Sequence, residues 1–310
     1  MTTGYTAVRD GGAGLIAMSE RGLIRVSGSE ATMFLNGLVT NDVKSLAENR
    51  WMPAVFPTVQ GRLIGAVNIA RLKDGFLIDT ERASHDGVLK TISRFTMAGD
   101  FKVTDITDES AIVSLQGRRA GEIVGKVLNT IVADLPRNGV SEHEGVTIIR
   151  ATHTAEDGFD LVADSPRVRE LGQALQDAGA TPVNEETFEI LRIEAGIARF
   201  GRDMDETNVV PETNLDDAVS FTKGCYVGQE IIVRIKHRGH PAKKLVGLKA
   251  DRPLEAGAVV TSAAVSPKLG NIGLGYVRYE HIEPGTDVIV DDDVKATVTE
   301  LPFIRGSWYE

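Results

Sequence analysis

The sequence predicts an α+β fold of two similar units followed by a C-terminal β-barrel. Three observations lead to this prediction. Strand-like runs joined by tight turns are followed by a helical pattern, which is typical of α+β rather than alternating β-α-β organisation. The same order then recurs once along the chain. After residue 240, short β-rich runs are separated by glycines and acids, a spacing typical of a small barrel.

The first unit combines strand-like apolar runs with two helical patterns. Ser29 is expected to cap the first helix, because a hydroxyl before a helical pattern can accept hydrogen bonds from free N–H groups. Gln60-Gly61 and Lys73-Asp74-Gly75 supply turns between strands. The expected strands are 23–26, 54–56, 63–69 and 75–78, and the expected helices are 31–38 and about 84–95.

The second unit and the C-terminal part are predicted from the same signals. The acidic stretch 201–217 has little periodicity, and loops of this length are usually functional or disordered. Because it leads into a glycine-cysteine loop, we expect it to be ordered and part of a site. The expected strands are 111–115, 146–150, 159–162, 245–248, 259–260, 273–277, 288–290 and 296–298, and the expected helices are 117–128, 166–179 and 185–194.

The change of texture near Pro241 predicts a domain boundary. Residues 1–240 form one predicted region with two related units, and residues 241–310 form the barrel. The two units are expected at about 1–105 and 106–240.

Composition limits the class of protein. A mass of 33.4 kDa suits two or three domains, and a hydrophobic content of 42% is ordinary for a soluble globular protein. One cysteine excludes an intramolecular disulfide and an all-protein cysteine metal cage, so no metal site is expected. No apolar run is long enough for a membrane span, and the N-terminus lacks a signal-peptide pattern. We therefore expect a cytoplasmic protein that does not bind a membrane.

The charge is negative overall but uneven along the chain. A net charge of −10 argues against nucleic-acid binding, which requires neutralisation of phosphates. The stretch 221–245 nevertheless holds six basic residues against one acid, Glu230. A local cationic patch on an acidic protein favours a small anionic ligand. A solvated, charged edge strand is the alternative interpretation.

The run 223–230, K-G-C-Y-V-G-Q-E, carries the only cysteine of the chain, Cys225. Its polar and glycine-rich composition predicts a tight loop, followed by a strand that begins at 231–233. Lys223 beside the thiol is expected to favour the reactive thiolate form. The alternative is that Cys225 is an inert small hydrophobic residue, as a lone cysteine often is.

Several stretches resemble one protein family. The run 223–230 matches the K-G-C-Y-x-G-Q-E signature of the folate-binding YgfZ family, relatives of the glycine cleavage T-protein (aminomethyltransferase). The resemblance covers nearly the whole chain. Further segments that resemble the wider superfamily are 34–42 (FLNGLVTND), 115–117 (LQG), 191–196 (LRIEAG), 211–212 (PE) and 301–303 (LPF).

The resemblance implies two folate-binding α+β units and a barrel around a central hole that holds tetrahydrofolate or a one-carbon derivative. Glu194 corresponds to the glutamate that reads the pterin edge, where a carboxylate can accept two parallel hydrogen bonds. The alternative is a helix-surface glutamate paired with Arg192 or Arg199. The residues expected to bind the cofactor, including those for the carboxylates of the folate tail, are Glu194, Arg192, Gln229, Glu230, Arg234 and Arg238, with Lys236 as a further tail contact.

One departure from the T-protein pattern concerns the catalytic acid. In T-proteins the strand after the Q-G turn carries an aspartate pair, one of which acts near the folate nitrogens. The matching positions here are Gly65-Ala66, and no carboxylate lies between Gln60 and Lys73. Because neither glycine nor alanine can transfer a proton, glycine cleavage is not expected.

Three functional hypotheses remain open. The first, implied by the YgfZ resemblance, is a tetrahydrofolate-binding accessory protein for iron–sulfur cluster assembly or repair, with Cys225 as the functional thiol and assembly or client proteins as partners. The second is a folate-dependent aminomethyl or one-carbon transferase with a shifted acid, Asp42 or Asp79. The third is a folate sensor whose basic patch docks a protein partner.

Overall fold

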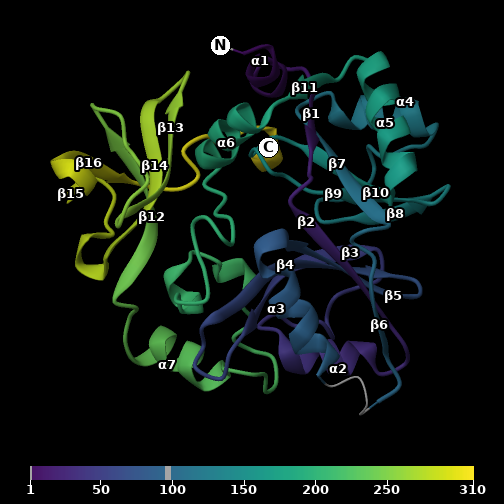
Figure 1. The fold of residues 1–310 in the computed structure, drawn as a ribbon, viewed down its shortest axis with the longest axis horizontal. Helices are drawn as coiled ribbons and strands as arrows, with labels where there is room; N and C mark the ends of the chain where they lie inside the picture. The colour runs from purple at the N-terminus through teal and green to yellow at the C-terminus, as the bar shows by residue number, and fades with distance from the viewer. Residues whose placement is uncertain (1, 95–98) are drawn as a thin grey trace. The chain divides into compact units, whose positions relative to one another are not determined.

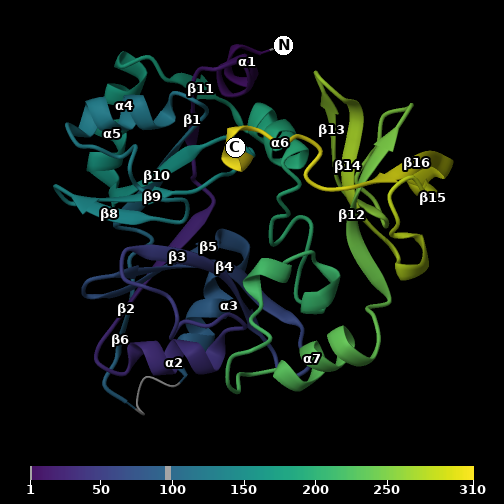
Figure 2. The ribbon, with the colours of Figure 1, turned by 180° about the vertical axis from the view of Figure 1, so that it is seen from behind.

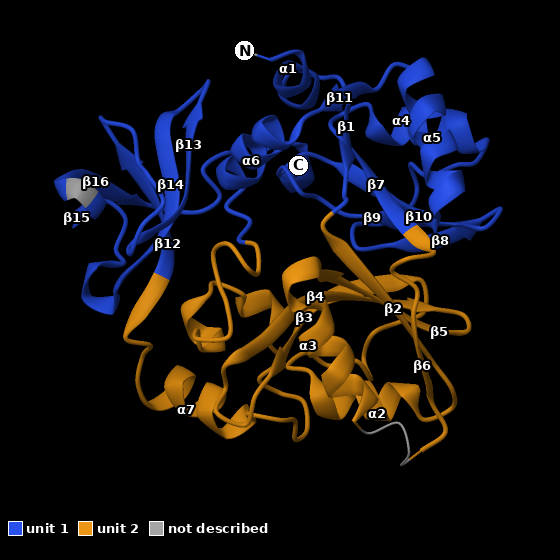
Figure 3. Cartoon of the chain, viewed as in Figure 1, with its two compact units in different colours: residues 1–19, 111–198, 245–310 blue, residues 20–110, 199–244 orange. Residues whose placement is uncertain are grey.

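The computed structural model describes residues 2–94 and 99–310, apart from the side chain of residue 292 (Figures 1 and 2). The chain divides into two units (Figure 3). Unit 1 comprises residues 1–19, 111–198 and 245–310, and unit 2 comprises residues 20–110 and 199–244. Each unit therefore joins segments that are far apart in the sequence. The predicted domain bounds follow the chain order instead, and they stay a prediction.

Unit 2 is built on a five-stranded antiparallel sheet in the order β3-β4-β5-β2-β6. Its core joins apolar side chains of the sheet to those of two helices, including Ile69 of β4, Leu35 of α2 and Val88 of α3. A further helix, α7, follows the Cys225 segment. The bounds are β2 Arg21–Ser27, β3 Arg50–Pro57, β4 Leu63–Leu72, β5 Gly75–Glu81, β6 Lys102–Asp105, α2 Ala31–Leu38, α3 Arg82–Ser93 and α7 Gln229–Arg238.

Unit 1 contains a six-stranded sheet in the order β11-β1-β7-β10-β9-β8, with β1 parallel to β11 and antiparallel to β7. Helices α4 and α5 pack on β10 and against each other. The core gathers Leu115, Val124, Phe159 and Leu171. The bounds are β1 Gly14–Ala17, β7 Ser110–Gln116, β8 Val140–His143, β9 Val146–Arg150, β10 Gly158–Asp164, β11 Thr181–Val183, α1 Thr3–Arg9, α4 Ala120–Leu128, α5 Ser165–Asp177 and α6 Glu185–Glu194.

The C-terminal part is a second sheet of five strands in the order β13-β14-β12-β16-β15. Ile193 of α6 packs against Ile272 and Leu274 of β14, so this helix covers part of the sheet. The mixed α/β fold with a C-terminal β-rich part is therefore confirmed, whereas closure into a barrel stays a prediction. The bounds are β12 Lys243–Ala250, β13 Val260–Ser266, β14 Gly270–Arg278, β15 Asp287–Val290 and β16 Val294–Thr299.

Two predictions about local structure are wrong. The strand expected from 231–233 lies inside helix α7, which starts after Gly228 in the left-handed conformation (φ 75°). An acid in the first turn and three bases in the last turn complement the dipole of this helix. Ser29 does not cap α2, since its hydroxyl donates to Asp100 and the N-cap is Glu30.

The remaining strands and helices of the prediction lie within a few residues of the observed ones. The expected end of the helix after β5, at Phe95, lies outside the described residues. The stretch 201–217 contains the short 3-10 helix Val210–Glu212, and a second one, Asp216–Ala218, begins at its end. Among the described residues, no helix combines the length and the apolar character that crossing a membrane would require.

Candidate functional site

Cys225 lies in an irregular loop of unit 2 that we define as the Cys225 loop, residues 220–228. The prediction of a loop at this place is confirmed, and both Gly224 and Cys225 are exposed. The thiol is therefore not buried, whereas the choice between a reactive and an inert Cys225 stays a prediction. Within the described residues, no three side chains of His, Cys, Asp and Glu gather closely enough to hold a metal ion.

Lys223 attaches this loop to the end of helix α2. Its Nζ atom donates to the main-chain oxygens of Asn36 at 2.7 Å, Val39 at 2.9 Å and Asn41 at 2.6 Å. Asn36 lies in the last turn of α2 and Val39 is its C-cap residue. The carbonyls at the end of a helix lack partners within the helix and carry partial negative charge. The ammonium group of Lys223 therefore caps α2 with charge-assisted hydrogen bonds.

The environment of Lys223 also perturbs its protonation. The side chain is buried, and this burial lowers the pKa of Lys223 to about 8, against the opposing effect of Asp42. Lys44 adds a smaller lowering effect. An ammonium group has three N–H donors, and the three carbonyls accept all of them. No N–H donor is therefore left for the thiol of Cys225. This geometry does not support the expectation that Lys223 favours the thiolate through a hydrogen bond.

Main-chain contacts continue this attachment on both sides of Lys223. The Val227 N–H donates to the oxygen of Gly37 at 3.2 Å, and the Ser220 N–H donates to that of Thr40 at 3.0 Å. The Thr40 hydroxyl in turn donates to the oxygen of Ala218 at 2.6 Å. The family-like segments at 34–42 and 223–230 are thus one structural site, although they are far apart in the sequence.

The Q-G turn before β4 reaches the same loop. Gly228 has a φ of 75°, and a Cβ at this position would lie 2.3 Å from the main-chain oxygen of Thr58. Only glycine tolerates both the left-handed backbone and this close approach. A Cβ at Gly61 would lie 3.2 Å from Ile231 of α7. Two glycines therefore allow the turn and the start of α7 to pack closely.

Two polar atoms near Lys223 stay unpaired. Tyr226 is 7% exposed, and burial raises its pKa to about 12. Its hydroxyl group and the side-chain oxygen of Asn36 have no hydrogen-bond partner in the part of the chain that the structure describes. The ring of Tyr226 lies 5.1 Å from Lys223 Nζ, within range of a cation–π contact. The loop is thus held by Lys223 and main-chain bonds rather than by these two side chains.

Helix α7 carries the other residues expected around the cysteine. Glu230, Arg234 and Arg238 are exposed and Gln229 is half-buried. Lys236 lies 3.5 Å from Asp216 in an exposed ion pair. The alternative of a charged edge strand is wrong, since these residues form a helix with one buried side chain, Ile232.

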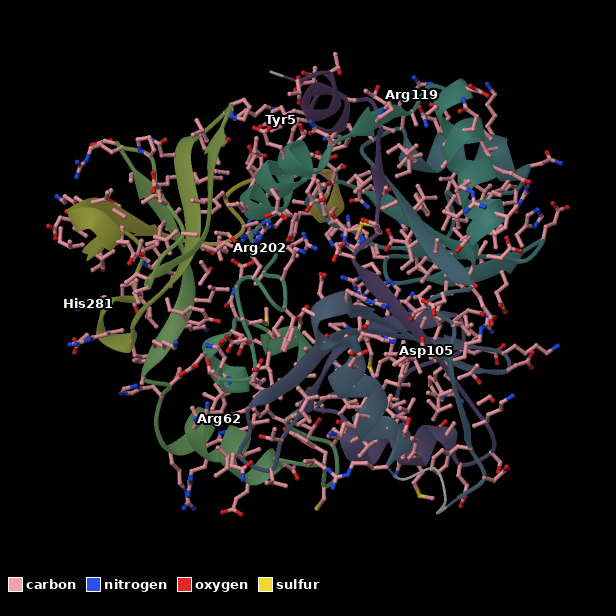
Figure 4. All side chains as sticks on the ribbon, viewed as in Figure 1. Tyr5, Arg62, Asp105, Arg119, Arg202 and His281 are labelled. Atoms are coloured by element: carbon pink, nitrogen blue, oxygen red, sulfur yellow. The ribbon has the colours of Figure 1, made fainter. Side chains whose placement is uncertain are left out.

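Glu194 lies in unit 1, in a buried polar network that includes Tyr5, which Figure 4 labels. Its Oε1 accepts from the Tyr5 hydroxyl at 2.7 Å and from the Ser266 hydroxyl at 2.5 Å. Its Oε2 accepts from Arg9, with Nε at 2.9 Å and a terminal nitrogen at 2.7 Å. Glu194 is 0% exposed, so the interpretation of a surface glutamate, outside the core, is wrong. Burial and the hydrogen bond to Glu194 raise the pKa of Tyr5.

Arg192 lies in the same helix and is 1% exposed. It donates to Glu189 at 2.7 Å, to the oxygen of Ile197 at 3.2 Å and to Ser262 of β13 at 2.5 Å. It therefore joins α6 to the C-terminal sheet. The expected site residues thus fall into two groups: Arg192 and Glu194 in unit 1, and the Cys225 loop with α7 in unit 2.

Gly65, the first of the two positions expected to lack an acid, has no space for a side chain. Gly65 belongs to the buried face of β4, and a Cβ there would lie 2.7 Å from Val88 and 2.9 Å from Ser84 of α3. An aspartate side chain does not fit at this position. The alternative acid Asp79 accepts two hydrogen bonds from Arg21, at 2.7 and 2.6 Å. Asp42 is half-buried and accepts from the N–H of Lys44 at 3.2 Å.

The chain is similar to known proteins over nearly its whole length. Residues 2–223 match the GCVT N-terminal domain, and residues 243–304 match the glycine cleavage T-protein C-terminal barrel domain. The aminomethyltransferase of Rubrobacter xylanophilus is 32% identical, with 94% of this chain and 83% of that protein covered. That of Saccharopolyspora erythraea is 30% identical, with 97% and 89% covered.

A solved structure shows the same fold. The aminomethyltransferase T of the Bartonella henselae glycine cleavage system matches with a TM-score of 0.90. The match covers 97% of this chain and 88% of that chain at 23% identity.

Proposed function

Because the chain belongs to the glycine cleavage T-protein family, we propose that it binds tetrahydrofolate or a one-carbon derivative. Arg234 and Arg238 support this proposal, since both are exposed on α7 and can receive the carboxylates of a folate tail. Gln229 and Glu230 at the start of the same helix are proposed to line the site.

Glu194 as the reader of the pterin edge stays a proposal, which has to compete with the contacts of Glu194 inside the fold. A carboxylate has about four acceptor positions, and Tyr5, Ser266 and Arg9 together fill them. A bidentate contact with a pterin would require these bonds to be exchanged. Arg192 is likewise committed to Glu189, Ile197 and Ser262. The folate proposal therefore rests on family membership and on α7, and we assign no reaction step to the cofactor.

At the level of the family, the names of the relatives favour aminomethyl transfer. Gly65 is the observation that argues against this activity here. The family's aspartate pair is missing at Gly65-Ala66, and at Gly65 the contacts with Val88 and Ser84 leave no room for a larger side chain. Asp79 is a weak substitute, because both of its carboxylate oxygens already accept hydrogen bonds from Arg21.

We therefore propose that the chain acts through the Cys225 thiol, as an accessory protein in iron–sulfur cluster assembly or repair. The exposure of Cys225 on a loop held by Lys223 is the observation that carries the proposal. A thiolate can ligate iron or attack a disulfide or persulfide. One thiol cannot hold a cluster alone, since clusters normally take four protein ligands. Cys225 would thus share its cargo with a partner protein, and a cytoplasmic location belongs to this proposal.

Complementation tests this role. In cells that lack the endogenous protein, the wild-type chain should restore the activity of cluster-containing enzymes and the Cys225→Ser variant should not. Thr222→Ser is a matched control, because Thr222 is an exposed residue of the same loop. Rescue by Cys225→Ser equal to that by the wild type would remove the thiol from the function.

Aminomethyl transfer is the second candidate, with the half-buried Asp42 as the acid. A glycine cleavage assay with the partner proteins and tetrahydrofolate separates the two candidates. Release of ammonia should stay at background for the wild type. Turnover near a common enzyme rate, about 10 per second, that is lost in Asp42→Asn would establish the transferase instead.

Folate binding is tested directly by calorimetry with tetrahydrofolate. The wild type should bind, and an Arg234→Ala, Arg238→Ala double variant should bind more weakly. Arg278→Ala is the control, since Arg278 is an exposed arginine of unit 1. A wild-type chain without measurable affinity would contradict the folate proposal and leave the thiol role to its own test.

A further inference from the structure

Lys223 lies in the Cys225 loop, two residues before the thiol, and two roles are open to it. A lysine near a cysteine can stabilise the thiolate, or it can hold the loop in place. The geometry distinguishes these roles, because three main-chain oxygens accept hydrogen bonds from the three N–H groups of the ammonium.

We propose that Lys223 is a positioning residue, which fixes the Cys225 loop by capping helix α2 and does not activate the thiol. The purpose of holding the loop in place rests on the proposed function of Cys225. The attachment itself is a property of unit 2. The resemblance of residues 223–230 to the family signature does not assign this role to Lys223.

The C-terminal end of α2 needs a donor that the helix itself does not provide. No basic residue lies in its last turn, and its C-cap residue Val39 has an extended backbone (φ −109°, ψ 161°). The oxygens of Asn36, Val39 and Asn41 converge on one point, where the ammonium group lies 2.6 to 2.9 Å from each. A compact group with three rotatable donors suits three converging acceptors, whereas a guanidinium group is a planar fork.

Few other contacts could replace Lys223 next to the thiol. Gly224 and Cys225 are exposed, and a Cβ on Gly224 would meet no atom within 4 Å. The buried hydroxyl of Tyr226 and the side-chain oxygen of Asn36 make no hydrogen bond among the described residues. After Lys223, the next hydrogen bond that joins the loop to α2 runs from the Val227 N–H to the main-chain oxygen of Gly37. Loss of the ammonium group should therefore free the residues around Cys225 first.

A spin label on Cys225 tests the proposal, because the single cysteine of the chain makes labelling specific. The Lys223→Met variant keeps the length and apolar stem of the side chain but has no donors. We expect a mobile component to appear in its electron paramagnetic resonance spectrum. The matched control is Lys73→Met, at an exposed lysine of the turn between β4 and β5. Its spectrum should equal that of the wild type.

The pH profile of alkylation of Cys225 separates positioning from activation. A positioning residue predicts the same midpoint in the wild type and in Lys223→Met. An activating charge predicts a midpoint raised by about one unit or more in the variant. Lys223→Arg should not restore the wild-type mobility, although it keeps the positive charge. Unchanged mobility in Lys223→Met, a raised midpoint, or full restoration by arginine would each overturn the proposal.

A measurement on the wild-type chain covers the case in which Lys223→Met does not fold. Competitive acetylation followed by mass spectrometry should find Lys223 much less reactive than Lys73, even above pH 8 where its amine is largely neutral. Equal reactivity would show that the cap does not form. None of these measurements uses folate or cluster-containing enzymes. Failure of complementation and failure of this inference are therefore independent outcomes.

Discussion

Glu194 in unit 1 and Lys223 in unit 2 are both buried charges within family-like motifs, and the protein compensates them in different ways. The side chains of Tyr5, Arg9 and Ser266 donate hydrogen bonds to the Glu194 carboxylate. The Lys223 ammonium instead donates its hydrogen bonds to three main-chain oxygens. The first arrangement joins α1, α6 and β13 in one network, whereas the second fixes one loop to one helix end.

The difference concerns what each charge stabilises. Removing Glu194 leaves Arg9 buried with only part of its charge compensated, by Glu156 at 3.1 Å. Removing Lys223 leaves neutral carbonyls, which are less costly to bury than an ion. We therefore expect Glu194 to affect the stability of the fold, and Lys223 to affect chiefly the order of a loop.

Glu194→Ala should produce the largest effect. Breaking a buried ion pair on one side costs about 3–5 kcal/mol, so the free energy of unfolding should fall by this amount. Urea denaturation measures it, with Glu230→Ala, an exposed glutamate of α7, as the control that should stay within about 0.5 kcal/mol. An unchanged midpoint for Glu194→Ala would show that the network is not important for stability.

Lys223→Met should have a smaller effect on the same measurement. Hydrogen bonds to a charged group contribute about 1.5–3 kcal/mol, and part of this is offset because a buried ammonium is no longer desolvated. We expect a loss within or below that range, together with faster hydrogen exchange at the Val227 amide. A loss as large as that of Glu194→Ala would mean that the two regions do not differ as proposed.

The pH dependence sharpens the comparison, because the pKa of Lys223 is lowered from 10.5 to about 8 in the folded chain. Between these values the unfolded chain binds a proton that the folded chain has lost, so stability gains from rising pH. The difference in unfolding free energy between wild type and Lys223→Met should therefore increase from pH 8 towards pH 10. The raised pKa values of Tyr5 and Tyr226 act equally in both chains. If this difference in unfolding free energy did not change with pH, the lowered pKa of the buried Lys223 would be contradicted.

Cys225→Ser should have the smallest effect on stability. The thiol is exposed, and such substitutions usually change the free energy of unfolding by less than about 0.5 kcal/mol. A melting curve measures this. A clear destabilisation would place the thiol in a structural role and weaken the proposal that its exposure serves chemistry.

The sequence predicts most strands and helices of both units, because their apolar periodicity is local. It fails at α7, where the β-branched run 231–233 favoured a strand. Tertiary context overrides this preference, since Ile232 alone faces the core. The acid in the first turn and the bases in the last turn were a signal for a helix that could have corrected the prediction.

The candidate site was predictable only in its local part. An exposed loop around Cys225 follows from its glycines and polar residues. The partners of the charged residues do not, because Arg9 lies 185 residues from Glu194 and Asn36 lies 187 residues from Lys223. No local pattern indicates such a pairing. Whether a charged motif residue faces a ligand or a buried partner therefore depends on chain contacts that only the structure supplies.

Unit 2 consists of two segments that are far apart in the sequence, and this has a consequence during synthesis of the protein on the ribosome. Within unit 2, residues 20–110 are made first, but Lys223 is synthesised 187 residues after Asn36, its acceptor in α2. At a synthesis rate of about 5–20 residues per second, the end of α2 waits roughly 10–40 s for its cap. During that interval the middle segment of unit 1 is made as well. The carbonyls at the end of α2 therefore lack the Lys223 ammonium until this late stage of synthesis.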